Sequence, residues 1–131
     1  MRLLIVDDNE SFLEVARVLL EREGLRVAGV ASTSADAFRQ LEALHPDVIL
    51  VDVFLGEESG LELSRRLAED GLSDKATVIL ISTHTEADLG DLIGASPAAG
   101  FVSKAELSAN AVRRIVDGSS ASPPANESRD R

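Results

Sequence analysis

Short apolar runs alternate five times with helical patterns along this chain, and this alternation limits the fold more than any other feature. The run 48–51 is apolar throughout and rich in β-branched residues, which is typical of a strand buried on both faces of a parallel sheet. Regular alternation of strand and helix predicts an α/β fold, with one doubly wound parallel sheet, right-handed crossovers and helices on both faces. The predicted strands are residues 3–6, 25–30, 47–53, 77–81 and 100–103.

The segments between these runs have the apolar spacing of helices that lie on a sheet. In the first helix we expect the apolar face to contain Phe12, Val15, Ala16, Val18, Leu19 and Leu20. Residues 56–60 are rich in glycine and polar side chains, which predicts a turn-rich loop. The predicted helices are residues 11–23, 33–44, 61–70, 88–93 and 105–117.

Charge and composition argue against several classes of function. The chain has 131 residues, a formal net charge of −10 and no cysteine, which predicts an acidic protein without disulfides or thiol chemistry. This charge argues against direct binding to nucleic acid or to an anionic membrane surface. No apolar run is long enough to span a membrane or to form a signal peptide, so the expected location is the cytoplasm.

Residues 118–131 contain almost no apolar side chains. Such a composition predicts a disordered tail. We therefore expect one domain over residues 1–117, followed by this tail. Nothing after Asp117 has the pattern of a DNA-binding or catalytic output domain, so the sequence predicts an effect on a separate partner protein.

The candidate functional residues stand at the ends of predicted strands: Asp7 and Asp8 after the first, Asp52 after the third, Ser82 after the fourth and Lys104 after the fifth. Parallel strands share their C-terminal edge, so we expect these side chains to meet there. Three adjacent carboxylates repel one another unless a cation lies between them, and an all-oxygen cluster suits Mg²⁺. Lys104 and Ser82 would add a positive charge and a hydroxyl group beside that cluster.

These residue types favour phosphoryl chemistry on a carboxylate. A carboxylate beside Mg²⁺ can attack a phosphoryl group and form an acyl phosphate, while the metal and a lysine neutralise charge on the transferring oxygens. Asp52 stands alone after the central strand and is therefore a better nucleophile candidate than the paired Asp7 and Asp8. A plain structural role stays open for single residues, since Asp52 and Ser82 could cap a loop or helix and Phe101 could be ordinary core.

Over residues 1 to about 117, the sequence resembles the receiver domain of two-component response regulators. The resemblance is carried by residues 3–8, 46–52, 78–82 and 100–104, and by Gly60 eight positions after Asp52. It implies a flavodoxin-like, five-stranded parallel sheet of order 2-1-3-4-5. It also implies a signalling protein, not an enzyme, which assists only its own phosphorylation and dephosphorylation.

The resemblance assigns a role to each residue of the cluster. Asp52 would accept a phosphoryl group from a histidine kinase or a phosphotransfer protein. Asp8, Asp52 and the backbone carbonyl of Phe54 would bind Mg²⁺ directly, and Asp7 would act mostly through water. Lys104 would contact the phosphoryl oxygens.

The resemblance also implies a switch. Ser82 would be drawn toward the phosphoryl group and Phe101 would turn inward behind it. Their movement would change the face made by the fourth helix, the fifth strand and the fifth helix. That face would bind a downstream protein, and a phosphorylation-dependent dimer is a second outcome that the sequence leaves open.

Three positions depart from the family's common pattern. Gly56 stands where a proline is often found, and Ala105 replaces the proline that usually follows the lysine, which leaves the geometry after Lys104 open. Thr83 is larger than the residue often found beside the switch hydroxyl.

Two other functions compete with phosphorylation-dependent signalling. A receiver-like module that binds proteins without phosphate is compatible with the departures at Gly56, Thr83 and Ala105. A small Mg²⁺-dependent phosphohydrolase with an aspartyl nucleophile is the other alternative. Phe54 argues against it, because this position would need a second acid to protonate the leaving group.

Overall fold

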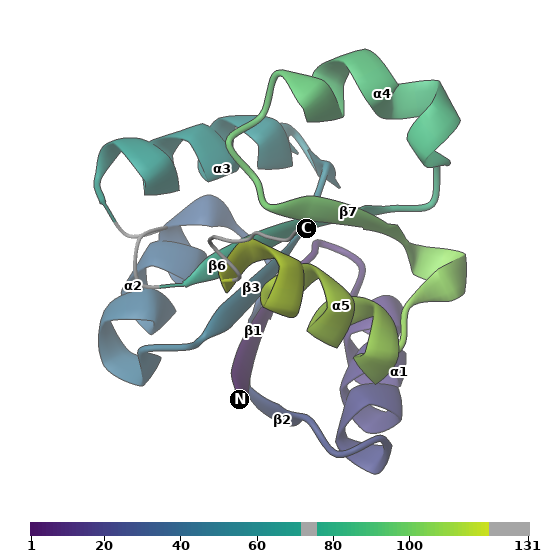
Figure 1. Cartoon of the computed structure of the whole chain (residues 1–131). Helices are drawn as coiled ribbons and strands as arrows, with labels where there is room; N and C mark the ends of the chain where they lie inside the picture. Colours follow the sequence, from purple (N-terminus) through teal and green to yellow (C-terminus); the bar gives the residue numbers. More distant parts are fainter. Residues whose placement is uncertain (72–75, 121–131) are drawn as a thin grey trace.

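The computed structural model describes residues 1–71 and 76–120, and it has a central parallel sheet with helices on both faces (Figure 1). The spatial order of the strands is β2-β1-β3-β6-β7, and every neighbouring pair is parallel. The predicted order 2-1-3-4-5 is confirmed, because β4 and β5 form a separate small sheet. The strands of the main sheet are β1 (Arg2–Val6), β2 (Arg26–Ala31), β3 (Val48–Asp52), β6 (Thr77–Ser82) and β7 (Gly100–Ser103).

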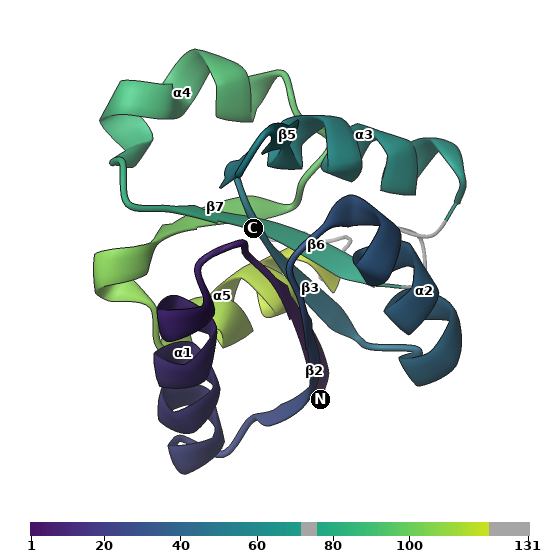
Figure 2. The same cartoon turned by 180° about the vertical axis from the view of Figure 1, so that it is seen from behind.

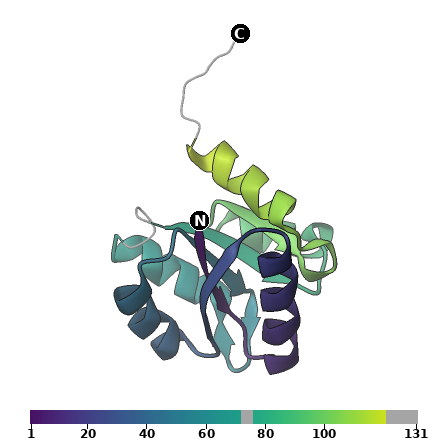
Figure 3. The ribbon, with the colours of Figure 1, turned by 90° about the horizontal axis from the view of Figure 1, so that it is seen from below.

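Two layers of helices enclose this sheet (Figure 2). One face is covered by α1 (Glu10–Arg22) and α5 (Ala109–Ser120), and the other by α2 (Ser34–Leu44), α3 (Gly60–Glu69) and α4 (Glu86–Gly94). The view from below shows α1 and α2 on opposite sides of the strands (Figure 3). Alternate side chains of a strand point to opposite faces, so Leu3 and Ile5 of β1 join the first core, whereas Leu4 and Val6 join the second.

The central strand β3 is buried along its whole length. It pairs with β1 on one side and with β6 on the other. Each fully buried Val, Ile or Leu side chain contributes about 1.5–3 kcal/mol to stability. Asp52, the last residue of β3, is therefore held by a strand that is buried over its whole length.

The buried face of α1 is narrower than the sequence predicted. Leu13, Ala16 and Leu20 are buried, whereas Val15 and Val18 are 64% and 43% exposed. The prediction that Val15 and Val18 lie on the buried face is wrong, because the helical rotation per residue carries them beyond the stripe that meets the sheet.

The last helix begins later and ends later than predicted. Lys104–Glu106 forms a 3-10 turn, and α5 starts only at Ala109. Ser108 sets this start, because its Oγ accepts a hydrogen bond from Ala111 N at 3.0 Å, as the side chain of an N-cap does. Residues 118–120, predicted as the beginning of a disordered tail, belong to α5. The rest of that predicted tail, residues 121–131, lies outside the described residues.

Two further elements near the C-terminal edge of the sheet differ from the prediction. Residues 54–59, which include most of the predicted loop 56–60, form an antiparallel hairpin, in which β4 (Phe54–Leu55) pairs with β5 (Glu58–Ser59). α4 begins before the predicted Asp88, because Thr85 Oγ1 caps it by accepting a hydrogen bond from Asp88 N at 3.2 Å.

None of the helices within residues 1–71 and 76–120 has the length and the apolar character that a membrane span requires.

Candidate functional site

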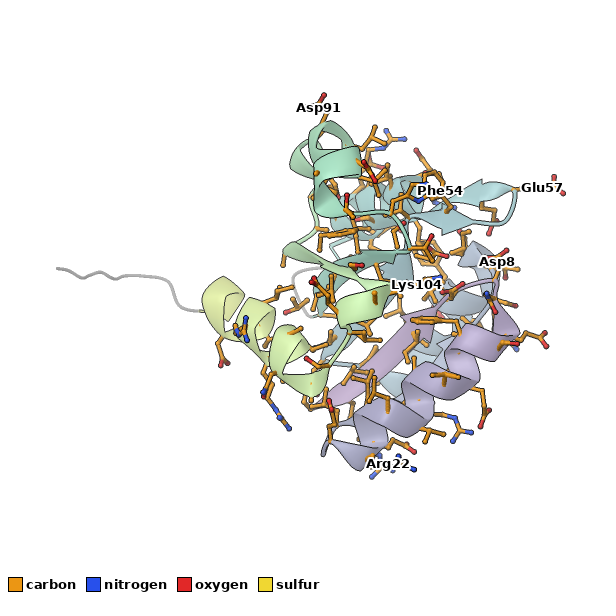
Figure 4. The ribbon with its side chains drawn as sticks, turned by 90° about the vertical axis from the view of Figure 1, so that its right-hand side faces the viewer. Asp8, Arg22, Phe54, Glu57, Asp91 and Lys104 are labelled. Carbon is orange, nitrogen blue, oxygen red and sulfur yellow. The ribbon has the colours of Figure 1, made fainter. Side chains whose placement is uncertain are left out.

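The C-terminal edge of the sheet brings three carboxylates and one ammonium group together. Asp7 and Asp8 follow β1, Asp52 ends β3 and Lys104 follows β7. One oxygen of each aspartate lies within 4.8 Å of the others. Figure 4 shows Asp8 and Lys104 at this end of the molecule, whereas Arg22 lies at the opposite end of α1. The structure thus assembles the acidic cluster and lysine that the sequence predicted for this edge.

Lys104 has three partners in this site. Its Nζ lies 2.6 Å from Asp7 Oδ2 and 3.2 Å from Asp52 Oδ2. It also lies 4.4 Å from the centre of the Phe12 ring, which is within the range of a cation–π interaction. The side chains of Asp7 and Asp52 are 0% and 8% exposed and that of Lys104 is 11% exposed, so water screens these charges only weakly.

Burial and the neighbouring charges shift the pKa of two groups in the site. Burial raises the pKa of Asp52 from 3.8 to about 6, and the Asp7 carboxylate adds to this increase, although Lys104 and the Phe54 N–H oppose it. For Lys104, burial lowers the pKa, but the hydrogen bond to Asp7 and the charges of both aspartates outweigh burial, so its pKa lies above the usual value. At neutral pH, Asp52 is therefore a carboxylate facing an ammonium.

The raised pKa of Asp52 predicts that Asp52→Asn stabilises the metal-free protein. A carboxyl group whose pKa is higher in the folded state contributes stability below the unfolded pKa of 3.8 and loses it as the pH rises through about 6. The neutral amide of the Asp52→Asn variant does not undergo this loss. In EDTA above about pH 7, we expect the free energy of unfolding of this variant to exceed that of the wild type by about 1–3 kcal/mol.

Urea denaturation of both proteins across the acidic and neutral range measures this difference. The gain should shrink as the pH falls and become small below about pH 3, where Asp52 is largely protonated in both the folded and the unfolded wild type. A constant difference at all pH values would show that the Asp52 charge is not its cause.

The donor set of the cluster fits a hard divalent cation. All three aspartates offer carboxylate oxygens, and their spacing allows one ion to reach them together. Mg²⁺ prefers oxygen ligands and is usually held by one or two carboxylates together with water. Asp8 is exposed, whereas Asp52 is buried, so the cluster meets solvent at Asp8.

Two turns lie against the carboxylates. Asp7 Oδ1 accepts a hydrogen bond from Asn9 N at 2.9 Å, at the start of α1. Opposite, Gly56 has φ +62° at the tip of the β4–β5 hairpin, and a Cβ there would lie 3.3 Å from Asp8 Oδ2. The fixed negative φ of proline is incompatible with this turn, so the backbone seen here could not form with the proline that is common at this position in the family.

Of the remaining predicted residues, Phe54 contacts Asp52, Ser82 ends the neighbouring strand β6, and Phe101 lies in β7 beside a groove. Phe54 N donates a hydrogen bond to Asp52 Oδ1 at 3.3 Å, and the exposed Phe54 ring lies 5.2 Å from the His84 ring, centre to centre. Ser82 ends β6 and is buried, and its Oγ accepts a hydrogen bond from His84 N at 3.1 Å. Phe101 is partly buried on β7 and lines a groove between α4 and α5. The peptide bond after Lys104 is trans.

The sequence did not indicate two contacts of the site. Phe12 was predicted only as part of the apolar face of α1, yet its ring faces the Lys104 ammonium. Glu58 was predicted only as part of a polar loop, yet its Oε1 accepts a hydrogen bond from Ser34 N at 2.9 Å and thereby ties the hairpin to the start of α2. Both contacts join segments distant in the sequence, so no local pattern could reveal them.

Comparison with known proteins identifies the family. A model of the response regulator receiver domain matches residues 3–116. The response regulator UvrY of Escherichia coli O6:H1 is 31% identical over 122 residues, which cover 90% of this chain and 55% of UvrY. The protein-glutamate methylesterase/protein-glutamine glutaminase 3 of Hahella chejuensis is 37% identical over 95 residues, which cover 72% of this chain and 26% of that protein.

A solved structure supports the same assignment. The two-component response regulator of the LuxR family from Aurantimonas sp. has a TM-score of 0.73 at 26% identity, over 89% of this chain and 85% of that chain. The chain therefore belongs to the response regulator receiver domain family of two-component signalling. It spans about half the length of UvrY. Receiver domains in general bind Mg²⁺ at an acidic pocket and receive a phosphoryl group from histidine kinases.

Proposed function

We propose that this chain is a phosphorylation-dependent signalling switch and that Asp52 is its phosphoacceptor. The observation that carries the proposal is the position of Lys104, whose ammonium lies 3.2 Å from Asp52 Oδ2 inside a carboxylate cluster. A fixed positive charge beside a buried carboxylate is suited to stabilise the additional negative charge that a phosphoryl group brings. The phosphoryl donor would be a histidine kinase or a phosphotransfer protein.

The acidic cluster supplies the ligands for Mg²⁺. Asp8, Asp52 and the backbone carbonyl of Phe54 would bind the ion directly, and Asp7 would act mostly through water. When bound, Mg²⁺ offsets negative charge on the phosphoryl oxygens. The chain's own residues position the nucleophile, because the Phe54 N–H and Lys104 hold different oxygens of Asp52.

The transfer is a displacement at phosphorus. An oxygen of the Asp52 carboxylate forms the new P–O bond while the P–N bond of a phosphohistidine breaks, and the electron pair of that bond stays on the imidazole nitrogen. Lys104 remains protonated and offsets charge on the transferring oxygens. The product is an acyl phosphate on Asp52 and a histidine free of phosphate.

Ser82 and Phe101 would transmit phosphorylation to the surface. Ser82 Oγ accepts a hydrogen bond from His84 N. A shift of Ser82 toward a phosphoryl group would therefore disturb the start of the β6–α4 connection. Phe101 lines the groove between α4 and α5 together with Ala87 and Ile115, so its movement would reshape the α4-β7-α5 face. This face would bind a downstream protein or a second copy of the chain.

Incubation with acetyl phosphate and Mg²⁺, followed by intact mass measurement, tests this function. We expect one added phosphoryl group on the wild type, no addition in EDTA and none on Asp52→Asn. Asp47→Asn is the matched control, because Asp47 precedes the same strand at the other end of the sheet, where its Oδ2 accepts a hydrogen bond from Arg2 N at 2.8 Å. Equal incorporation into Asp52→Asn would contradict the proposal, and no incorporation into any protein would favour a module that acts without phosphate.

A further inference from the structure

We propose that Phe12 is a positioning residue that holds the Lys104 ammonium in place for phosphoryl transfer. The inference deepens the proposed function and rests on it. Lys104 Nζ lies 4.4 Å from the centre of the Phe12 ring, over its face. The negative face of an aromatic ring attracts a cation, and the attraction strengthens where water is excluded. Since the Lys104 side chain is only 11% exposed, this contact lies in a poorly screened environment.

The position of Phe12 is itself fixed by the carboxylate cluster. Asp7 Oδ1 accepts a hydrogen bond from Asn9 N, and Asn9 Oδ1 accepts one from Phe12 N at 3.1 Å. Asp7 Oδ2 in turn pairs with Lys104. Asp7, Asn9, Phe12 and Lys104 therefore form a closed ring of contacts that links the first turn of α1 to the end of β7.

An aromatic ring holds the Lys104 ammonium in a different way from a carboxylate. Lysine has a flexible stem and a compact charge, so in the resting site its ammonium can follow whichever carboxylate attracts it most. When a cation occupies the carboxylates, their attraction for the ammonium falls, whereas that of the ring does not. The ring also does not neutralise the positive charge of Lys104, so this charge can still interact with the phosphoryl oxygens.

The core packing of Phe12 can be separated from this contact. Phe12 is partly buried against the core formed by α1 and α5, so leucine retains much of its apolar contact and loses only the aromatic face. Tyrosine keeps that face. The second cation–π pair of the chain's described part, Arg66 over Phe38 at 4.7 Å between α2 and α3, provides a matched control, because it lies on the other face of the sheet.

The test compares phosphorylation rates with acetyl phosphate at saturating Mg²⁺ for the wild type, Phe12→Leu, Phe12→Tyr and Phe38→Leu. We expect Phe12→Leu to be slower by about fivefold, the factor that corresponds to a partly desolvated cation–π contact. Phe12→Tyr should stay near the wild-type rate, and Phe38→Leu should match the wild type. Phe12→Met replaces Phe12→Leu in the comparison if leucine prevents folding, because methionine fills irregular gaps.

A second measurement follows the contact directly. Protons on the Lys104 side chain near the ring face should show an upfield NMR shift that disappears in Phe12→Leu and persists in Phe12→Tyr, in the metal-free protein. An unchanged Lys104 signal in Phe12→Leu would overturn the inference, as would equal slowing of Phe12→Leu and Phe12→Tyr, which would mean a packing role alone. A wild-type rate in Phe12→Leu would overturn it while leaving the proposed function intact, whereas absence of phosphorylation in the wild type would overturn both.

Discussion

Lys104→Ala is expected to lower the free energy of unfolding by about 3 kcal/mol in EDTA, because it leaves buried carboxylates without their cation. Asp7 is fully buried, and its Oδ2 lies 2.6 Å from Lys104 Nζ. Asp52 Oδ2 lies 3.2 Å from the same nitrogen. The two carboxylates would then repel each other at close range. Saturating Mg²⁺ should restore most of the lost stability, since a cation bound at the cluster replaces the missing positive charge.

Urea denaturation in EDTA and in Mg²⁺ measures this effect. Arg17→Ala is the control, because Arg17 pairs with Glu14 and Glu21 on the exposed face of α1, where removal of a pair costs less than about 1 kcal/mol. Calorimetry should also show tighter Mg²⁺ binding by Lys104→Ala, because the competing ammonium is gone. A loss of stability that is equal in EDTA and in Mg²⁺ would contradict the electrostatic account.

Gly60→Ala is expected to be the most destabilising single-methyl change in the site, with a loss of more than about 3 kcal/mol. A Cβ at Gly60 would lie 1.8 Å from the backbone oxygen of Asp52 and 2.7 Å from its carbonyl carbon. Both atoms belong to the backbone, so they cannot move aside without displacing the end of β3. Gly60 N also donates a hydrogen bond to Val53 O at 2.9 Å, which fixes the start of α3 against the same strand.

Thermal and urea denaturation of Gly60→Ala and Gly90→Ala separate the clash from the general effect of adding a methyl group. A Cβ at Gly90 in α4 meets no atom within 4 Å, so Gly90→Ala should raise stability by up to about 1 kcal/mol through helix propensity. Gly60→Ala should also fail to accept a phosphoryl group, because the backbone of Asp52 is displaced. Near wild-type stability of Gly60→Ala would show that α3 can move away from β3 at little cost.

The sequence predicted the sheet well because its signals are local and strong. Five apolar runs between amphipathic segments define the alternation, and the resemblance to receiver domains supplied the strand order, which the structure confirms. Errors arose where tertiary context decides. Val15 and Val18 fit an apolar pattern but lie outside the stripe of α1 that meets the sheet, and the start of α5 depends on capping by Ser108.

The sequence predicted the part of the site whose residues stand at or just after the ends of strands. Asp7, Asp8, Asp52 and Lys104 meet because parallel strands deliver their last residues to one edge. The β4–β5 hairpin, which brings Gly56 against Asp8, was missed because its strands are very short and their pairing depends on a single positive φ. The Phe12–Lys104 contact was missed because it joins residues from opposite ends of the chain.

The role of Asp52 as phosphoacceptor is tested most directly by locating the phosphoryl group on the chain. Borohydride reduces an acyl phosphate of aspartate to homoserine, so wild-type protein treated with acetyl phosphate and Mg²⁺ can be reduced, digested and sequenced by mass spectrometry. We expect homoserine at position 52, and only when Mg²⁺ is present. Homoserine at Asp7 or Asp8 instead, or its absence from a protein that has gained a phosphoryl group, would contradict the assignment of Asp52 as the phosphoacceptor.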